Sequence, residues 1–154
     1  MTHFLIAAFL IGVIAGLRCL TAPAVVSWAV RLGWLNVAGS PVGFMGAAAT
    51  PYIFSALAIG ELVADQLPNI PSRKAPPGFI TRLVTGALCG AVFGAAGQAL
   101  AGGAIAGVAG AIAGTLGGYE ARVRLAQSLG KDLPAALIED AIAISGAFLL
   151  VRWG

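Results

Sequence analysis

Long apolar segments with very few charges are the feature that most restricts how this chain can fold. Five such segments follow one another, at about Phe4 to Leu32, Pro51 to Leu67, Phe79 to Leu100, Gly103 to Tyr119 and Leu133 to Val151. A helix of about 20 apolar residues crosses the hydrocarbon core of a bilayer. Only 10% of the 154 residues are charged, against roughly a quarter in a soluble domain. We therefore expect an all-α integral membrane protein: one domain over residues 1–154, folded as a compact bundle of about five transmembrane helices.

The first segment is long for one crossing and has an arginine, a threonine and a proline in its middle, in AGLRCLTAPA at residues 15–24. Pro23 cannot donate a hydrogen bond to the carbonyl of Cys19, and its ring pushes against that turn. We therefore expect the first helix to be kinked or broken between Gly16 and Pro23. The N-terminal stretch resembles a signal peptide but has no Lys or Arg before the apolar run, so we expect it to be retained.

Basic residues predict the orientation of such a bundle. With five spans, the end that bears the N-terminus also carries Arg73, Lys74, Arg82, Arg122, Arg124 and Lys131, and the other end carries only Arg31 and Arg152. The positive-inside rule then predicts a cytoplasmic N-terminus and an outside C-terminus, with Trp28, Trp34 and Trp153 at the outer interface. The net charge of +3 is spread along the chain without a basic run, so no nucleic-acid partner is expected.

Glycines recur at helical spacing in the third and fourth segments, at Gly86, Gly90 and Gly94, at Gly103 and Gly107, and at Gly110, Gly114 and Gly118. Such stripes let helices approach closely in a bilayer, either within one chain or between the chains of a homo-oligomer. The short connection at Gly102 and Gly103 predicts an antiparallel hairpin of these two segments.

A weak internal repeat relates the first and fourth segments. IGVIAG at residues 11–16 resembles AGAIAG at residues 109–114. With an odd helix between them, the two segments would run in opposite directions, as in the inverted-topology repeats of many transporters. The alternative is that segments rich in Gly, Ala and Ile look alike by composition alone.

Arg18 is the most informative charge in the sequence. A charge at the bilayer centre costs about 2.5–3.5 kcal/mol, so we expect Arg18 to face the protein interior and to have a partner among Glu61, Glu139 and Asp140. The arginine is then either part of a structural ion pair or part of a site for an anion or a lipid phosphate. Thr21, in the same break, is a further candidate for ligand binding.

Glu61 and Asp65 are four residues apart, which places them on one face of the second helix. Two close carboxylates in a medium of low dielectric constant disfavour double ionisation, which suits proton coupling or cation binding. The alternative is that both residues anchor the helix by pairing with Arg73, Lys74 or Arg82.

Further charges lie near the ends of the last two segments. Glu139 and Asp140 are adjacent, so they point about 100° apart and do not easily share one partner. We expect one of them, with Glu139 the candidate, to be functional and the other to be a solvated cap. Glu120 and Arg124 have the spacing of a structural ion pair along a helix.

The remaining reactive residue types indicate no metal and no other cofactor. Cys19 and Cys89 lie in apolar surroundings without the spacing of a zinc site or a disulfide framework, so we expect them to pack. His3 is isolated, and no cluster of His, Cys and acidic residues predicts a metal site.

The stretches GLRCLTAPAVVSWAVRLGWL and ELVADQLPNIPSRKAPPGFITRLVTGALCGA resemble a family of small bacterial multi-pass membrane proteins that is defined only as a domain of unknown function. The resemblance covers roughly the first two thirds of the chain. Arg18 and Pro23 fit the Gly-x-Arg and proline pattern of that family, and Glu61 fits an acidic position. The resemblance implies an all-helical fold and a bacterial inner-membrane location, and it implies no reaction.

Together these observations favour a small carrier or channel for a small solute or ion. Its polar interior would hold the candidate binding residues Arg18, Thr21, Glu61, Asp65 and Glu139, and the protein would contact membrane lipids and form a homo-oligomer. The alternative is a structural or lipid-binding membrane scaffold in which the same charges pair with one another. An enzyme acting on lipids is disfavoured because the aspartate-rich motifs that bind metals are missing.

Overall fold

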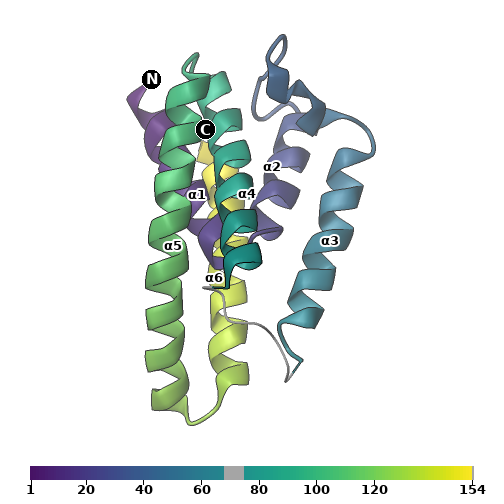
Figure 1. Ribbon diagram of the computed structural model, residues 1–154. Helices are drawn as coiled ribbons and strands as arrows, with labels where there is room; N and C mark the ends of the chain where they lie inside the picture. The colour runs from purple at the N-terminus through teal and green to yellow at the C-terminus, as the bar shows by residue number, and fades with distance from the viewer. Residues whose placement is uncertain (68–74, 154) are drawn as a thin grey trace.

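The computed structural model describes residues 1–67 and 75–153, which form a bundle of helices without any β-strand in these two ranges (Figure 1). The elements are α1 (Thr2–Leu17), α2 (Thr21–Arg31), the 3-10 helix η1 (Pro41–Gly46), α3 (Thr50–Ala64), α4 (Pro76–Ala96), α5 (Leu100–Leu129) and α6 (Asp132–Trp153). Helices α4, α5 and α6 are long and apolar enough to cross a membrane, and α1 and α3 are shorter apolar helices. The all-helical fold expected from the sequence is thus confirmed. Arg73 and Lys74 lie outside the described residues.

The first apolar segment is two helices. α1 ends at Leu17, Arg18 has an extended backbone with φ −138° and ψ 106°, and α2 begins at Thr21. Pro23 lies in the first turn of α2, where a missing N–H leaves no helical hydrogen bond unmade. The expected break is therefore present, and it lies at residues 18–20.

Helices α1 and α2 run in opposite directions, and together they form a helical hairpin whose turn lies inside the bundle (Figure 1). Both outer ends of this hairpin lie beside the end of α6. The ring centroids of His3 and Trp153 are 6.2 Å apart, and those of Trp34, which follows α2, and Phe148 are 6.0 Å apart. The segment therefore does not run through the bundle in one direction, and the expected bundle of five spans is not confirmed.

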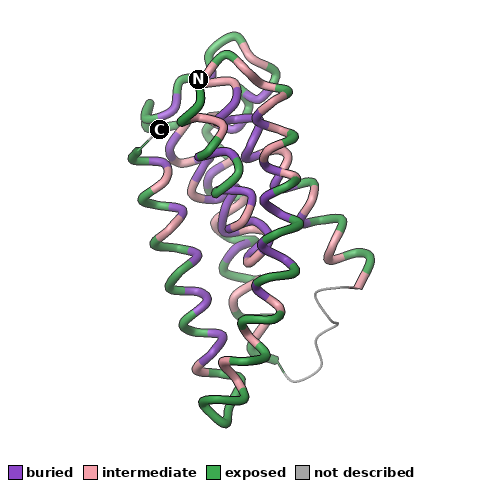
Figure 2. Tube along the Cα trace, turned by 90° about the vertical axis from the view of Figure 1, so that its left-hand side faces the viewer, coloured by how far each residue is buried: buried purple, intermediate pink, exposed green. Residues whose placement is uncertain are grey.

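The extra reversal changes the topology of everything that follows. Helices α1, α3 and α5 run away from the end that holds the N-terminus, and α2, α4 and α6 run back toward it (Figure 1). Both termini consequently lie at the same end of the bundle (Figure 2). The prediction that they lie at opposite ends is wrong, because it treated the first apolar segment as one helix, whereas the segment forms two helices that run in opposite directions.

Helices α1, α4 and α5 pack backbone against backbone through their glycines. A Cβ built at Gly107 would overlap the carbonyl oxygen of Gly86 on α4, and one built at Gly12 would overlap the carbonyl oxygen of Gly107. Gly12 meets Gly107 and Gly16 meets Ala111, so α1 and α5 run parallel. Of the two interpretations of the internal repeat, the inverted topology required opposite directions for these helices and is wrong, because the chain makes one more reversal.

The predicted antiparallel hairpin of α4 and α5 is confirmed. Gly86 lies against Gly107, and Gly94 lies against Gly103, so residue numbers rise along one helix as they fall along the other. The turn is Gly97–Ala99, so the glycines expected to make it belong to α5. Because these stripes pack within one chain, they give no argument for association between chains.

The opposite end of the molecule is formed by the turn between α5 and α6. Gly130 closes α5 with φ +69°, a left-handed conformation that glycine adopts without a steric cost. The residues around this turn are exposed, and the buried residues lie along the faces on which the helices meet (Figure 2). Arg122, Arg124 and Lys131 lie toward this end, which we call the basic end.

We predict that Gly107→Ala lowers the free energy of unfolding by about 1–3 kcal/mol, because the added methyl group would overlap the backbone of Gly86 and Gly90 and α4 must move away. Gly117→Ala on the same helix is the matched control, since nothing lies within 4 Å of the Cβ built there. Its effect should stay within about 1 kcal/mol and be stabilising. Unfolding of the detergent-solubilised protein by heat or SDS measures both, and equal effects would contradict the packing described.

Candidate functional site

Arg18 is the centre of a buried charge cluster at the break between α1 and α2. It is 0% exposed to solvent. Its Nη1 donates to Oδ2 of Asp65, which directly follows α3, and its Nη2 donates to Oδ1 of Asp140 on α6. A buried charge is stable only when it is paired and hydrogen-bonded. Arg18 therefore links the break between α1 and α2 to the end of α3 and to α6.

Glu61 occupies the other side of the break. Its carboxylate accepts hydrogen bonds from the backbone N–H of Cys19 and of Leu20, both at 2.9 Å, and from the Cys19 thiol at 3.1 Å. The N–H groups at the start of a helix have no partner within it, and the helix dipole favours a negative charge there. Glu61, a side chain of α3, thus caps the N-terminus of α2.

A second charged group lies nearer the basic end. The guanidinium of Arg122 on α5 binds both carboxylate oxygens of Asp132, with Nε to Oδ1 at 3.0 Å and Nη2 to Oδ2 at 2.7 Å. Its Nη1 lies 3.8 Å from Oε2 of Glu139, which is buried on α6. Arg122 therefore joins the end of α5 to the start of α6.

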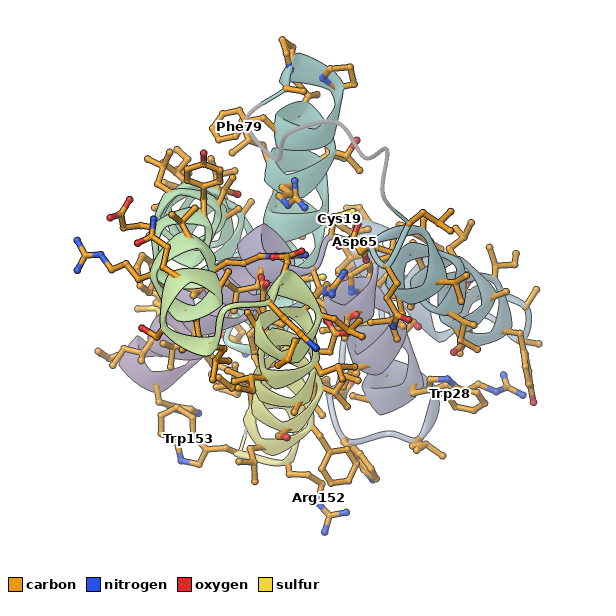
Figure 3. The ribbon with its side chains drawn as sticks, turned by 90° about the horizontal axis from the view of Figure 1, so that it is seen from below. Cys19, Trp28, Asp65, Phe79, Arg152 and Trp153 are labelled. Carbon is orange, nitrogen blue, oxygen red and sulfur yellow. The ribbon has the colours of Figure 1, made fainter. Side chains whose placement is uncertain are left out.

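A cavity of about 990 Å³ lies between these two charged groups. The ends of α3 and α5 and the starts of α4 and α6 form its walls, and Cys19 of the helix break also lines it. Viewed from below, Cys19 and Asp65 lie close together between α3 and α4 (Figure 3). The charged residues that line it are Glu61, Asp65, Arg82, Arg122 and Asp132. The cavity is therefore lined by charges of both signs, in walls that also hold Leu67, Pro77, Val123 and Leu133.

Three of the predicted binding residues, Arg18, Glu61 and Asp65, are brought together at the break. Thr21 is buried and its hydroxyl has no hydrogen-bond partner in the described part of the chain, but it does not line the cavity. Glu139 is buried beside Arg122 and does not line the cavity either. The structure thus assembles the predicted site only in part.

The predicted partners of individual charges need correction. Asp140 pairs with Arg18 as expected, but Glu61 and Glu139 do not, and Asp65 was not among the candidates. Glu61 and Asp65 do not share one ligand, because each carboxylate has its own donors. Glu139 and Asp140 are both 8% exposed, so neither is a solvated cap.

Two smaller predictions have clear outcomes. Glu120 and Arg124 form the expected pair along α5, with Nε to Oε1 at 2.9 Å. Cys89 is fully buried and packs in the core, as expected. Cys19 differs, because its thiol donates to Glu61 and it lines the cavity.

Sequence reasoning did not place Arg82 and Arg122 in the binding site and treated them mainly as signals of topology. A signal for Arg122 was present, because it continues the stripe of Gly110, Gly114 and Gly118 by one more turn of α5. A residue on the packed face of a helix points toward the protein. Arg82 lies in an apolar run one turn before Gly86, which contacts α5, and the same reasoning applies to it.

We predict that Arg18→Gln destabilises the fold by about 3–5 kcal/mol, because Asp65 and Asp140 are left without their counter-charge. Adding Asp140→Asn should restore part of this loss, which makes the two changes less than additive. Arg124→Gln removes an exposed ion pair and serves as the control, with an expected effect below about 1 kcal/mol. A small effect of Arg18→Gln in thermal unfolding would contradict the structural role of the cluster.

The described residues contain no group of three or more His, Cys, Asp or Glu side chains that could hold a metal ion. Comparisons with protein-family models, with curated proteins and with solved structures find no match to this chain.

Proposed function

We propose that the protein is a membrane carrier that binds a small charged molecule in the cavity below the helix break. One observation carries this proposal: a cavity of about 990 Å³ extends between the basic end and the charged break. Sites for small molecules are clefts of about this volume, with mainly apolar walls and a few polar groups. Charged side chains inside the membrane region of a protein typically line substrate or ion pathways.

In the opposite half of the bundle the facing sides of α1 and α4 are tightly packed, which favours a carrier over a channel. Ala7, Ala8 and Ile11 on α1 and Val92 and Phe93 on α4 are completely buried there. A channel needs a continuous path across the membrane. A carrier holds a site that is open to one side at a time.

In this proposal α4, α5 and α6 cross the bilayer, and the hairpin of α1 and α2 enters it from the side of the termini. A non-helical turn at membrane depth is tolerated where protein surrounds it or where it lines a cavity. The backbone at Arg18 to Leu20 meets this condition, since Glu61 satisfies two of its N–H groups. In this arrangement three helices cross the bilayer and one hairpin enters it from one side, in place of the five crossings expected from the sequence.

The basic residues also support an orientation for the proposed carrier. Arg122, Arg124 and Lys131 lie toward the cavity end, whereas Arg31 and Arg152 lie toward the end of the termini. By the positive-inside rule, the cavity opens to the cytoplasm and both termini face outside. The bacterial inner membrane, implied by the family resemblance, is the setting of this proposal.

A structural or lipid-binding scaffold is the second candidate. It is favoured by the pairing of the buried charges, since Arg18 binds two carboxylates and Glu61 accepts three hydrogen bonds. The two candidates differ in one physical respect. A carrier must expose the cavity residues to both sides of the membrane in turn, and a scaffold exposes them to one side.

The two cysteines allow this difference to be measured. We expect Cys19, kept in a Cys89→Ala variant, to react with a membrane-impermeant maleimide from the cytoplasmic face of oriented vesicles. From the outer face it should also react completely, about ten- to a thousandfold more slowly, if the outward-open state has a population of about 0.1–10%.

The control for this labelling is the reverse variant, Cys19→Ala, in which only Cys89 remains. Cys89 is 0% exposed and should not react from either face. Labelling of Cys19 from the cytoplasmic face alone would refute the carrier and leave the scaffold. Mass spectrometry of the intact chain measures each reaction.

The proposed orientation has its own test. Reporter proteins that are active only outside the cytoplasm should be active when fused to either terminus, because both termini lie at the same end. A reporter inserted after Gly130, in the exposed turn between α5 and α6, should be inactive. Opposite activities of the two terminal fusions would contradict the hairpin of α1 and α2.

A further inference from the structure

The guanidinium groups on the cavity wall already have partners. Arg122 donates from Nε and Nη2 to Asp132, and its Nη1 lies 3.8 Å from the carboxylate of Glu139. Arg82, which lines the cavity from α4, also has interaction partners of its own. An anionic ligand would therefore have to compete with existing partners for either arginine.

The carboxylates on the wall differ in how far their oxygens are occupied. Both oxygens of Asp132 are bound by Arg122. In Glu61, Oε1 accepts two hydrogen bonds and Oε2 accepts one. Asp65 uses Oδ2 for Arg18, and its Oδ1 accepts no hydrogen bond from the described part of the chain. Among the cavity-lining carboxylates that the structure describes, Asp65 alone thus has an oxygen without a donor.

This oxygen can be reached from the cavity. Asp65 lines the cavity, and 18% of its side chain is exposed. Its Oδ2 is held against the Arg18 guanidinium, which is completely buried, so Oδ1 is the oxygen that is available to a ligand. Glu61 lines the same cavity one helical turn before Asp65, and its negative charge strengthens the attraction of a cation to this wall.

The rest of the wall indicates which kind of cation fits. A metal ion such as Ca²⁺ takes six to eight oxygen ligands, and no group of three or more candidate metal ligands is present in the described residues. An ammonium group needs only acceptors for its N–H bonds, and a hydrogen bond between two ionised groups is stronger than a neutral one. Leu67, Pro77, Val123 and Leu133 also line the cavity, and they can contact an apolar part of the same ligand.

We propose that the cavity binds an organic ammonium ion. Its ammonium group donates a hydrogen bond to Oδ1 of Asp65, and its apolar part lies against the aliphatic side chains of the wall. This inference rests on the proposed function, because it names the charge and the chemical class of the molecule that the cavity holds.

The test is isothermal titration calorimetry of the full chain in detergent with three probes that share a benzyl group. Benzylamine is a cation at neutral pH, benzyl alcohol is neutral and phenylacetate is an anion. We expect benzylamine to bind at one site per chain, at least tenfold more tightly than either of the other two, which corresponds to about 1.4 kcal/mol.

Two variants locate the binding site. Asp65→Asn removes the charge but leaves Asp140 as the counter-charge of Arg18, and it should weaken benzylamine binding by at least about tenfold. Ala126→Trp fills the cavity without changing its charge and should weaken binding as strongly, so it tests the inference even if Asp65→Asn does not fold. Ala121→Trp, at an exposed position of the same helix, is the matched control and should bind as the wild type does.

Four results would overturn the inference. Tighter binding of phenylacetate would mean a site for anions, and equal binding of benzyl alcohol would mean that charge is not recognised. Competition by ammonium chloride as strong as that by benzylamine would mean that the apolar wall contributes nothing. Equal binding by the two tryptophan variants would mean binding outside the cavity. Labelling of Cys19 from one face only would refute transport without affecting these measurements, so the two proposals fail separately.

Discussion

The burial of one guanidinium group is the constraint on which the rest of the structure depends. Arg18 is completely shielded from solvent, and the cost of removing an ion from water is several kcal/mol even after relaxation. Two carboxylates must therefore reach it at one depth. Asp140 is eight residues into α6, about 12 Å along the helix, and Asp65 directly follows α3. The position of Arg18 consequently determines where α3 can end and which face of α6 turns inward.

The same constraint explains the helix break. An extended residue at position 18 stops α1 and leaves the first N–H groups of α2 without partners. Glu61 supplies the missing acceptor, and Asp65, one helical turn later, supplies the counter-charge for Arg18. Glu61 on α3 and Asp65 directly after it thus have separate functions. The break, the Arg18 charge and the end of α3 form one unit. Without Glu61 the N–H groups at the break would lack an acceptor, and without Asp65 the Arg18 guanidinium would lack a counter-charge.

The sequence was sufficient to predict the helices, the break, the hairpin of α4 and α5 and a partner for Arg18. It was insufficient for the topology, because the length of an apolar run measures how much helix is present and not its direction. A polar break at Arg18 is equally consistent with a kink in one helix and with a reversal of the chain direction. The outcome is decided by packing partners far away in the chain, such as Trp153 beside His3. The position of Arg122 on the cavity wall was predictable from the glycine stripe, because the stripe marks the face of α5 that points toward the protein and Arg122 continues it.

Two kinds of attachment hold the helices, and they differ in how easily they rearrange. Helices α1, α4 and α5 meet through glycine backbones, and a close-packed interface of this kind cannot slide without losing its contacts. Helix α3 has only Pro51 and Ala58 buried, and its polar side chains hold it to the break. A hydrogen bond can be exchanged for a bond to a ligand or to water at a small net cost, provided that no buried group is left without a partner. In the proposed carrier, a change in access to the cavity is therefore expected to move α3 against a fixed unit of α1, α4 and α5, with the break at Arg18 as the point where the two meet.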